Sequence, residues 1–162
     1  MDLKKHILEH EILGISDCGS SVSSQIQIQQ GMLWLYDEER EKWLSVSRPQ
    51  LLSTRKKAKN AYLRAGEGVA LFETGFKMIR DGMITNIAVS TSNSVPVSWD
   101  LKIRKNNLFT DLDALPVTGN GNIIENRDIE FSKEDLIQVY CDTGNYLIED
   151  IIVLLEIAWI LT

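Results

Sequence analysis

The two histidines of the sequence, His6 and His10, flank Glu9 near the N-terminus. On a helix, this His-x-x-Glu-His spacing would place both imidazoles one turn apart beside a carboxylate, which suits zinc ligation and general-base catalysis. At the extreme N-terminus, however, a surrounding pocket cannot form in the usual way. We therefore expect a polar turn of an amphipathic arm, with no metal bound.

Catalysis by a nucleophile is not expected either. Without a third histidine, a Ser-His-Asp or Cys-His arrangement lacks a base. Two Gly-x-Gly pairs, at 66–68 and 119–121, lack the strand-to-helix context of a phosphate-binding loop. Asp111 and Asp113 could form a weak calcium site with nearby carbonyls, although a solvated surface is the favoured interpretation. The sequence therefore predicts no enzyme activity and no cofactor.

Two clusters could bind a partner instead. Residues 55–59, Arg-Lys-Lys-Ala-Lys, are the one basic cluster of a chain whose net charge is -6. We expect them to be a solvated connector, with contact to an acidic partner as the alternative. Trp34, Tyr36 and Trp43 either pack within a hairpin, which we favour, or stack on sugar rings. The negative net charge argues against nucleic-acid binding.

Length and composition are those of a soluble globular domain with a short appendage. The chain has 162 residues, of which 44% are hydrophobic and 25% charged, enough to bury a core without a metal or disulfide. No apolar run reaches the ~18 residues of a membrane span. No signal peptide is expected, because Glu9 and Glu11 interrupt the only candidate stretch. Cys18 and Cys141 are expected to be free thiols of a protein made in a cytoplasm.

Alternation with a period of two is strongest in the C-terminal half and predicts strands. It is clearest at 97–103, where Val, Trp, Leu and Ile occupy the odd positions and polar residues the even ones. Residues 83–90, 129–131 and 137–141 repeat the pattern, and turn residues separate these segments. Short strands of this kind predict an all-β sandwich or barrel.

The C-terminal strand, residues 150–161, is apolar on both faces apart from Glu156. Such a strand is either central between two covered faces or buried in a subunit interface. The outer face of a small antiparallel sandwich normally meets water, so we favour the interface. Its predicted contact residues are Ile151, Val153, Leu155, Ile157 and Trp159.

The N-terminal residues are unlike this core. Residues 1–30 are expected to form an arm. It would hold a short, imperfectly amphipathic helix over 1–13, a Ser/Gly-rich linker over 16–24 and an exposed strand over 24–30.

The next segment, 31–60, is expected to be an aromatic hairpin, with strands at 32–36 and 42–46, followed by the basic connector. Residues 61–162 would form the sandwich head. Because an isolated hairpin is marginally stable in water, this one must pack on the C-terminal domain or on a second copy of itself.

Three sets of residues resemble one protein family. Residues 31–48, GMLWLYDEEREKWLSVSR, resemble a hairpin that precedes the head domain in many tailed-phage structural proteins. Residues 62–64, YLR, and 78–89, MIRDGMITNIAV, look like a strand and a strand pair of the same domains. Residues 99–106, WDLKIRKN, and 153–159, VLLEIAW, are similar to two further strands. The family comprises phage fibre-head and capsid-decoration proteins.

The resemblance covers residues 31–162 and implies a jelly-roll head of the tumour-necrosis-factor and C1q type, which typically forms trimers. The last strand would then line or approach a threefold axis. The resemblance implies no catalytic residue. Residues 1–30 would be an anchor that becomes ordered on docking. The predicted anchor residues are Leu3, Ile7, Leu8, Ile12 and Leu13.

The sequence therefore predicts an all-β, antiparallel jelly-roll-like β-sandwich preceded by an N-terminal arm and a β-hairpin. The predicted function is that of a non-enzymatic phage virion protein: a homotrimeric capsid-decoration or head-fibre protein at the virion surface. It would be made in the host cytoplasm, bind the major capsid or another virion protein through its arm, and enter no membrane. The alternative is a tail-associated module that binds host glycan through loops at 106–113, 119–126 and 142–145.

Overall fold

A computed structural model describes residues 25–66, 68, 75–92, 97–106, 111–121, 123–124 and 127–162. Every regular element in these ranges is a β-strand, and no helix in them could span a membrane. The predicted anchor residues lie outside the described part of the chain, as do Cys18 and the histidine motif. These anchor residues are Leu3, Ile7, Leu8, Ile12 and Leu13.

Three antiparallel strands form a small sheet, called the hairpin sheet below: β1 (Ile26–Gln29), β2 (Met32–Asp37) and β3 (Lys42–Ser45). Gln30 and Gly31 link β1 to β2 with positive φ angles of 53° and 74°, as a tight two-residue turn requires. The predicted aromatic hairpin is confirmed. However, β1, which we predicted within the N-terminal arm, pairs with β2 along its whole length.

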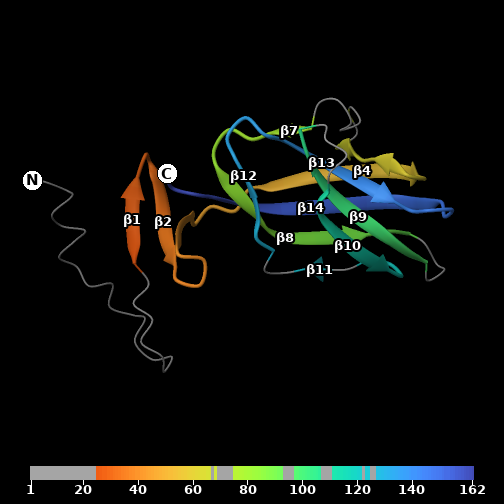
Figure 1. Ribbon diagram of the computed structural model, residues 1–162, viewed down its shortest axis with the longest axis horizontal. Helices are drawn as coiled ribbons and strands as arrows, with labels where there is room; N and C mark the ends of the chain where they lie inside the picture. The colour runs from red at the N-terminus through yellow and green to blue at the C-terminus, as the bar shows by residue number, and fades with distance from the viewer. Residues whose placement is uncertain are drawn as a thin grey trace, which may run out of the picture.

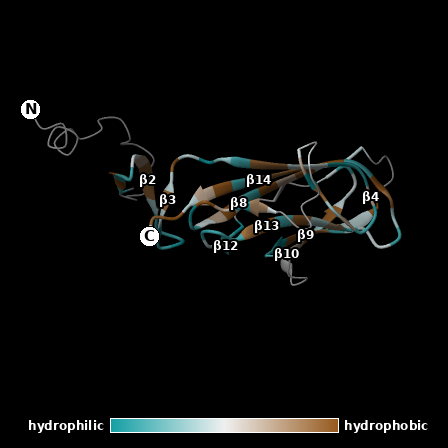
Figure 2. Cartoon of the chain, turned by 90° about the horizontal axis from the view of Figure 1, so that it is seen from above, coloured by the Kyte–Doolittle hydropathy of each residue, from teal (hydrophilic) through white to brown (hydrophobic). Residues whose placement is uncertain are grey.

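The later strands form two sheets packed face to face (Figures 1 and 2). The first contains β4 (Gln50–Ala58), β6 (Arg64–Ala65), β8 (Gly82–Ser90), β11 (Ile123–Ile124), β12 (Ile129–Phe131) and β14 (Ile148–Trp159). The second contains β5 (Ala61–Tyr62), β7 (Phe76–Lys77), β9 (Ser98–Lys105), β10 (Asp111–Thr118) and β13 (Leu136–Asp142). The strand orders are β11-β8-β14-β4-β6, with β12 also on β8, and β10-β9-β13-β5, with β7 also on β13.

The pairing pattern is that of a jelly roll. β4 pairs with β14, β5 with β13, β8 with β12 and β9 with β10, all antiparallel. Early strands pair with late ones, so the pairs nest inside one another like the arms of one long folded hairpin. The predicted fold class is confirmed.

The core lies between the two sheets and follows the alternation of the sequence. On β9, Trp99, Leu101 and Ile103 are buried, whereas Ser98 and Asp100 are exposed. The inward residues of β12 and β13 join the same cluster. Because one face of each strand meets the opposite sheet and the other meets water, a period of two predicts burial correctly here.

β14 corrects our prediction of a subunit interface. Ile151, Val153, Leu155 and Ile157 are at most 1% exposed and belong to the core of the single chain. Trp159 is half-buried and packs edge-on against Phe131. A second copy could not contact side chains that the opposite sheet already covers, so Ile151, Val153, Leu155 and Ile157 are not available for a trimer contact, whereas Trp159 remains partly exposed.

The hairpin sheet is attached to one end of the sandwich, near the C-terminus (Figure 1). Leu44 packs in a separate small cluster with Met83, Ala158 and Ile160. Leu44 also forms a β-bridge with Ile160, and the Leu161 N–H donates to the Trp43 carbonyl at 3.0 Å. The hairpin sheet therefore packs on the C-terminal domain.

The basic segment is not a connector, which is the second correction. Residues 55–58 belong to β4, which pairs with β14 from Gln50 to Ala58. The prediction failed because Arg and Lys have no apolar alternation to reveal a strand. Their place in the sheet depends on pairing with a segment near the other end of the chain.

Candidate interaction surfaces

The hairpin sheet exposes two cross-strand rows of aliphatic side chains. In the first row, Ile28 lies opposite Leu33 in the register, and the Val46 N–H donates to the Leu33 carbonyl at 2.9 Å. These three residues are 64%, 42% and 48% exposed. Directly opposed side chains lie on the same face of a sheet. The row therefore crosses the whole hairpin sheet.

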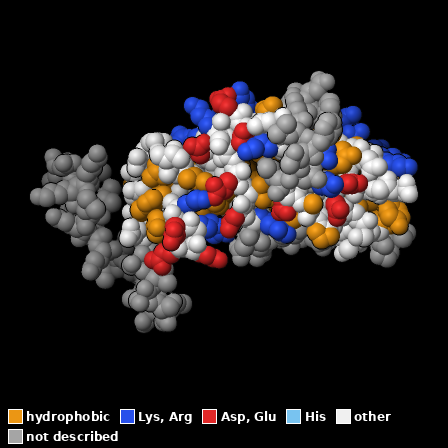
Figure 3. Space-filling model, in the orientation of Figure 1, with side chains coloured by type: hydrophobic (Ala, Val, Ile, Leu, Met, Phe, Trp, Pro, Cys, Tyr) orange, Lys and Arg blue, Asp and Glu red, His pale blue; other side chains and the backbone are white. Residues whose placement is uncertain are grey.

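The second row runs Ile26, Leu35, Leu44. Leu44 is buried against the sandwich, Leu35 is half-buried and Ile26 is 48% exposed. We call the five uncovered or half-covered residues of both rows the aliphatic face: Ile26, Ile28, Leu33, Leu35 and Val46. Hydrophobic side chains are visible over this sheet in Figure 3. Grouped apolar exposure of this kind is typical of an interaction site.

The opposite face of the hairpin sheet carries the aromatic residues. Trp34 is 1% exposed, and its indole N–H donates to the Gln29 carbonyl at 2.9 Å. The rings of Tyr36 and Trp43 are tilted by 60°, with centroids 5.3 Å apart. A buried ring and a tilted pair do not form a flat sugar-binding platform, so the aromatic residues are packing residues, as we favoured.

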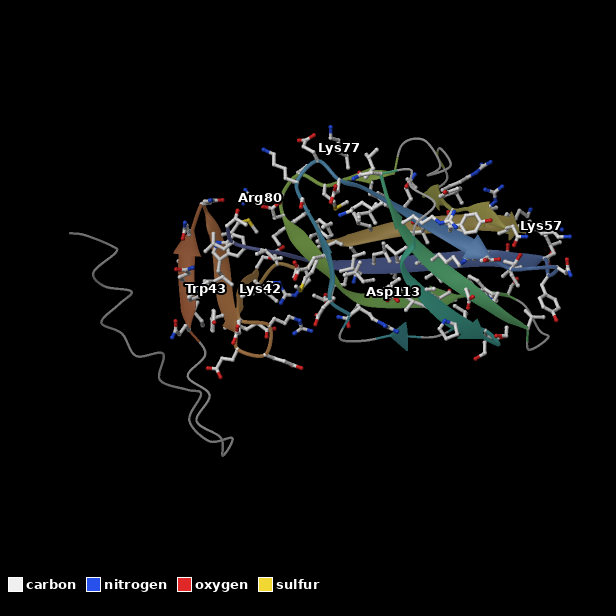
Figure 4. The ribbon with its side chains drawn as sticks, viewed as in Figure 1. Lys42, Trp43, Lys57, Lys77, Arg80 and Asp113 are labelled. Atoms are coloured by element: carbon white, nitrogen blue, oxygen red, sulfur yellow. The ribbon has the colours of Figure 1, made fainter. Side chains whose placement is uncertain are left out.

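A second surface lies at the edge formed by β4 and β6, at the end of the sandwich away from the hairpin sheet. A groove of about 380 Å³ is lined by Thr54, Arg55, Lys56, Lys57, Arg64 and Gly66. We call it the cationic groove. Figure 4 labels Lys57 at this end and Lys42 and Trp43 at the other.

A more open groove of about 370 Å³ adjoins it and shares Thr54, Arg55, Lys56 and Gly66. The residues that line it alone are Leu52, Asp150, Ile151 and Ile152. Leu52 and Ile152 are 43% and 45% exposed, and the Asp150 carboxylate accepts from the Ser92 hydroxyl at 2.8 Å. We call it the apolar groove. Only residues 55–59 of this region stand out in the sequence, because Arg64 and Ile152 reach it through their separate pairing with Thr54.

Asn106 and Asp142, in two of the loops predicted to bind glycan, use their side chains within the molecule. Asn106 accepts from the Leu136 N–H at 2.8 Å and donates to Asp135 at 2.8 Å. Asp142 forms an ion pair with Lys102 at 2.8 Å, and the hydrogen bond from Lys102 lowers the Asp142 pKa. These groups stabilise turns, so they add no support for a sugar site.

No group of three His, Cys, Asp or Glu side chains within the described ranges could hold a metal ion. Asp113 forms an ion pair with Arg127 at 3.3 Å and accepts from the Ala114 N–H. Its carboxylate therefore binds groups of the chain itself, whereas the calcium site that we considered as an alternative would need it to bind a cation. Cys141 is a free, buried thiol, and burial raises its pKa to about 12, so it stays protonated at neutral pH.

A buried cation that no sequence pattern indicated lies on the outer side of the second sheet. Arg104 is 7% exposed, and its guanidinium carbon lies 4.0 Å from the centroid of the Tyr140 ring. It also donates to the Tyr62 hydroxyl at 3.0 Å. The register brings these residues together from β9, β13 and β5. The contacts suit packing of a desolvated cation against aromatic rings.

Comparisons of the chain with protein-family models, curated proteins and solved structures found no match.

Proposed function

We propose that this protein is a non-enzymatic structural protein of a tailed-phage virion. It acts as a homotrimer that decorates the capsid or forms a short head fibre, and its N-terminal residues attach it to the particle. The proposal rests on the resemblance of residues 31–162 to phage head domains, and the jelly-roll fold is compatible with it.

The observation that carries the proposal is the aliphatic face of the hairpin sheet. Ile28, Leu33 and Val46 form a continuous apolar row that is about half exposed in the single chain. A homotrimer would cover this face with the same face of two further copies. We therefore place the proposed contact between copies on the hairpin sheet and not on β14, where we predicted it from the sequence.

Self-association suits this face because its five residues are aliphatic. The chain has a net charge of -6, so copies repel one another over most of their surface. The five residues of the aliphatic face are uncharged, so burying them removes apolar area from water. The next row on the same side of the sheet, Asp37 and Lys42, is already ion-paired with Arg40 and Glu130. Three copies related by a threefold axis would form a closed assembly rather than a filament.

Native mass tests this proposal. At micromolar concentration, light scattering coupled to size exclusion should give about three times the monomer mass of 18.4 kDa. The double variant Ile28→Glu/Leu33→Glu should run as a folded monomer, because it places six carboxylates in the closed contact.

A matched control is Tyr146→Glu/Leu147→Glu, which adds the same charge at two exposed positions in the turn between β13 and β14. It should remain trimeric. Circular dichroism checks that both variants are folded. A monomeric wild type, or a trimeric Ile28→Glu/Leu33→Glu variant, would refute the assignment of this face.

A further inference from the structure

The cationic groove concentrates positive charge in an acidic protein. Arg55, Lys56, Lys57 and Arg64 line it, four of the chain's 17 Lys and Arg residues. Among the described residues, only Lys57 of these four lies within 4.0 Å of a carboxylate, that of Glu149 at 2.9 Å. Figure 3 shows basic side chains gathered at this end of the molecule. The groove is therefore a local site for an anion.

Part of this charge is held in place before any ligand binds. The Arg55 guanidinium donates to the carbonyls of Tyr62 at 2.6 Å and Lys57 at 2.9 Å. The Thr54 hydroxyl donates to the Gly66 carbonyl, which ties β4 to the end of β6. The Arg55 charge is therefore ordered before a ligand binds and adds to the positive potential of the groove. Lys56, Lys57 and Arg64 are exposed and would become ordered on binding.

Apolar surface continues directly from the charge. The apolar groove shares part of its lining with the cationic groove and exposes Leu52 and Ile152. Both residues lie on the outer face of the first sheet, which the opposite sheet does not cover. A ligand that fills both grooves needs acidic groups and aliphatic groups a few residues apart.

An extended chain fits the shape of this edge. β6 pairs with β4 only at Ser53 and Thr54, whereas β4 continues to Ala58. Both grooves are lined by Thr54, Arg55 and Lys56 of this strand, and they differ in reaching β6 at Arg64 or β14 at Ile152. Successive side chains of an extended peptide alternate in direction, so acidic and aliphatic positions would reach different parts of the edge.

Other anionic polymers fit less well. Among the described residues that line the two grooves, none has an aromatic side chain on which a base or a sugar ring could stack. A nucleic acid would extend beyond four basic residues onto a surface with net negative charge. A short acidic peptide would contact only the groove and would not extend onto that negative surface.

We infer that the cationic and apolar grooves together bind an acidic polypeptide segment that carries aliphatic side chains. Its carboxylates would pair with Lys56, Lys57 and Arg64, and its aliphatic side chains would cover Leu52 and Ile152. This inference does not depend on the virion assignment.

The test uses the full chain and a fluorescent peptide of Glu-Leu-Glu-Ser repeats, followed by anisotropy at low salt. The peptide should bind, and a version with serine in place of leucine should bind more weakly. Lys56→Glu/Arg64→Glu should weaken binding about tenfold or more, because two ion pairs become repulsions. Raising the salt should weaken binding by the wild type.

The charge control is Lys77→Glu/Lys133→Glu, which changes net charge equally at exposed positions outside both grooves. It should bind like the wild type. Leu52→Ser/Ile152→Ser should abolish the preference for the leucine peptide. Circular dichroism and thermal melts verify folding of each variant.

Three results would overturn the inference. The first is no binding of the peptide, and the second is an equal loss in the Lys77→Glu/Lys133→Glu control. The third is a tighter complex with single-stranded DNA or polygalacturonate that Lys56→Glu/Arg64→Glu abolishes. That third result would assign the groove to another class of polyanion.

Discussion

Neighbouring residues of β14 have opposite surroundings. Leu155 is fully buried between the sheets, whereas Ile152 is 45% exposed on the outer face. The strand is therefore apolar on both sides for two separate reasons. From Ile151 to Ile157 its odd positions build the core, which Ile148 also joins, and its even positions line the outer face, where the hairpin sheet packs on Ala158.

Glu156 illustrates how a carboxylate is tolerated in this strand. It lies on the outer face, where one oxygen accepts from the Thr85 hydroxyl at 2.8 Å and from the Asn86 amide at 2.7 Å. Satisfied hydrogen bonds offset the cost of partial burial. The one polar interruption that we noted in the sequence therefore marks the outer face of the strand.

Leucine-to-alanine substitutions test the assignment of β14 to the core. Leu155→Ala should lower the free energy of unfolding by about 2–5 kcal/mol, because it leaves a cavity among fully packed side chains. Leu52→Ala, at a 43% exposed position on the neighbouring strand, should cost about 1 kcal/mol or less. Urea denaturation measures both. If Leu155→Ala changed the native mass and left protomer stability intact, our original interface assignment would be restored.

At the scale of elements, the turn between β12 and β13 depends on one carboxylate. Asp135 accepts from the Ser132 N–H and from the Asn106 amide, each at 2.8 Å, and Lys105 lies 3.3 Å away. Burial alone would raise the Asp135 pKa. The hydrogen bonds and the lysine outweigh that effect, so the pKa is lowered.

This turn should contribute to acid sensitivity. Because the folded-state pKa of Asp135 lies below its unfolded value, its stabilising contribution is present above about pH 4 and is lost as the pH falls through the folded pKa. Asp135→Asn should reduce stability at pH 7 and narrow the stability difference between pH 7 and pH 3, measured by urea denaturation. An unchanged difference between the two pH values would exclude this role for Asp135.

At the scale of the whole molecule, the two candidate surfaces lie at opposite ends. The aliphatic face belongs to the hairpin sheet beside the C-terminus, and the cationic groove lies at the far end of the sandwich (Figure 4). A trimer closed at the hairpin sheet would therefore leave the distant grooves available. The proposed assembly and the proposed peptide site are compatible.

The boundary of the arm changes with the position of β1. We predicted an arm of residues 1–30, but β1 completes the hairpin sheet from Ile26 onward. A deletion of residues 1–24 preserves that sheet, so it should leave a folded trimer. Under the proposed function, this truncated trimer should no longer co-sediment with phage particles that bind the full chain. Binding by the truncated protein would show that attachment does not need these residues.

The sequence by itself determined where most strands lie. At 97–103 and 137–141, and again at 32–36 and 42–46, the predicted strands agree with β9, β13, β2 and β3 to within a few residues. Alternation is a local property, because each residue type reports whether its own side of the strand meets apolar atoms or water. Local pattern was therefore enough for the fold class and for much of the core.

Only the tertiary structure decided which surfaces are open. Both faces of β14 look alike in sequence, and only the second sheet determines that Leu155 is covered and Ile152 is not. Likewise, Arg64 and Ile152 reach the grooves because each pairs with Thr54 from a different part of the chain. Strand pairing between distant segments sets these neighbours, and no local pattern encodes the partner. The candidate sites therefore appear only in the folded molecule.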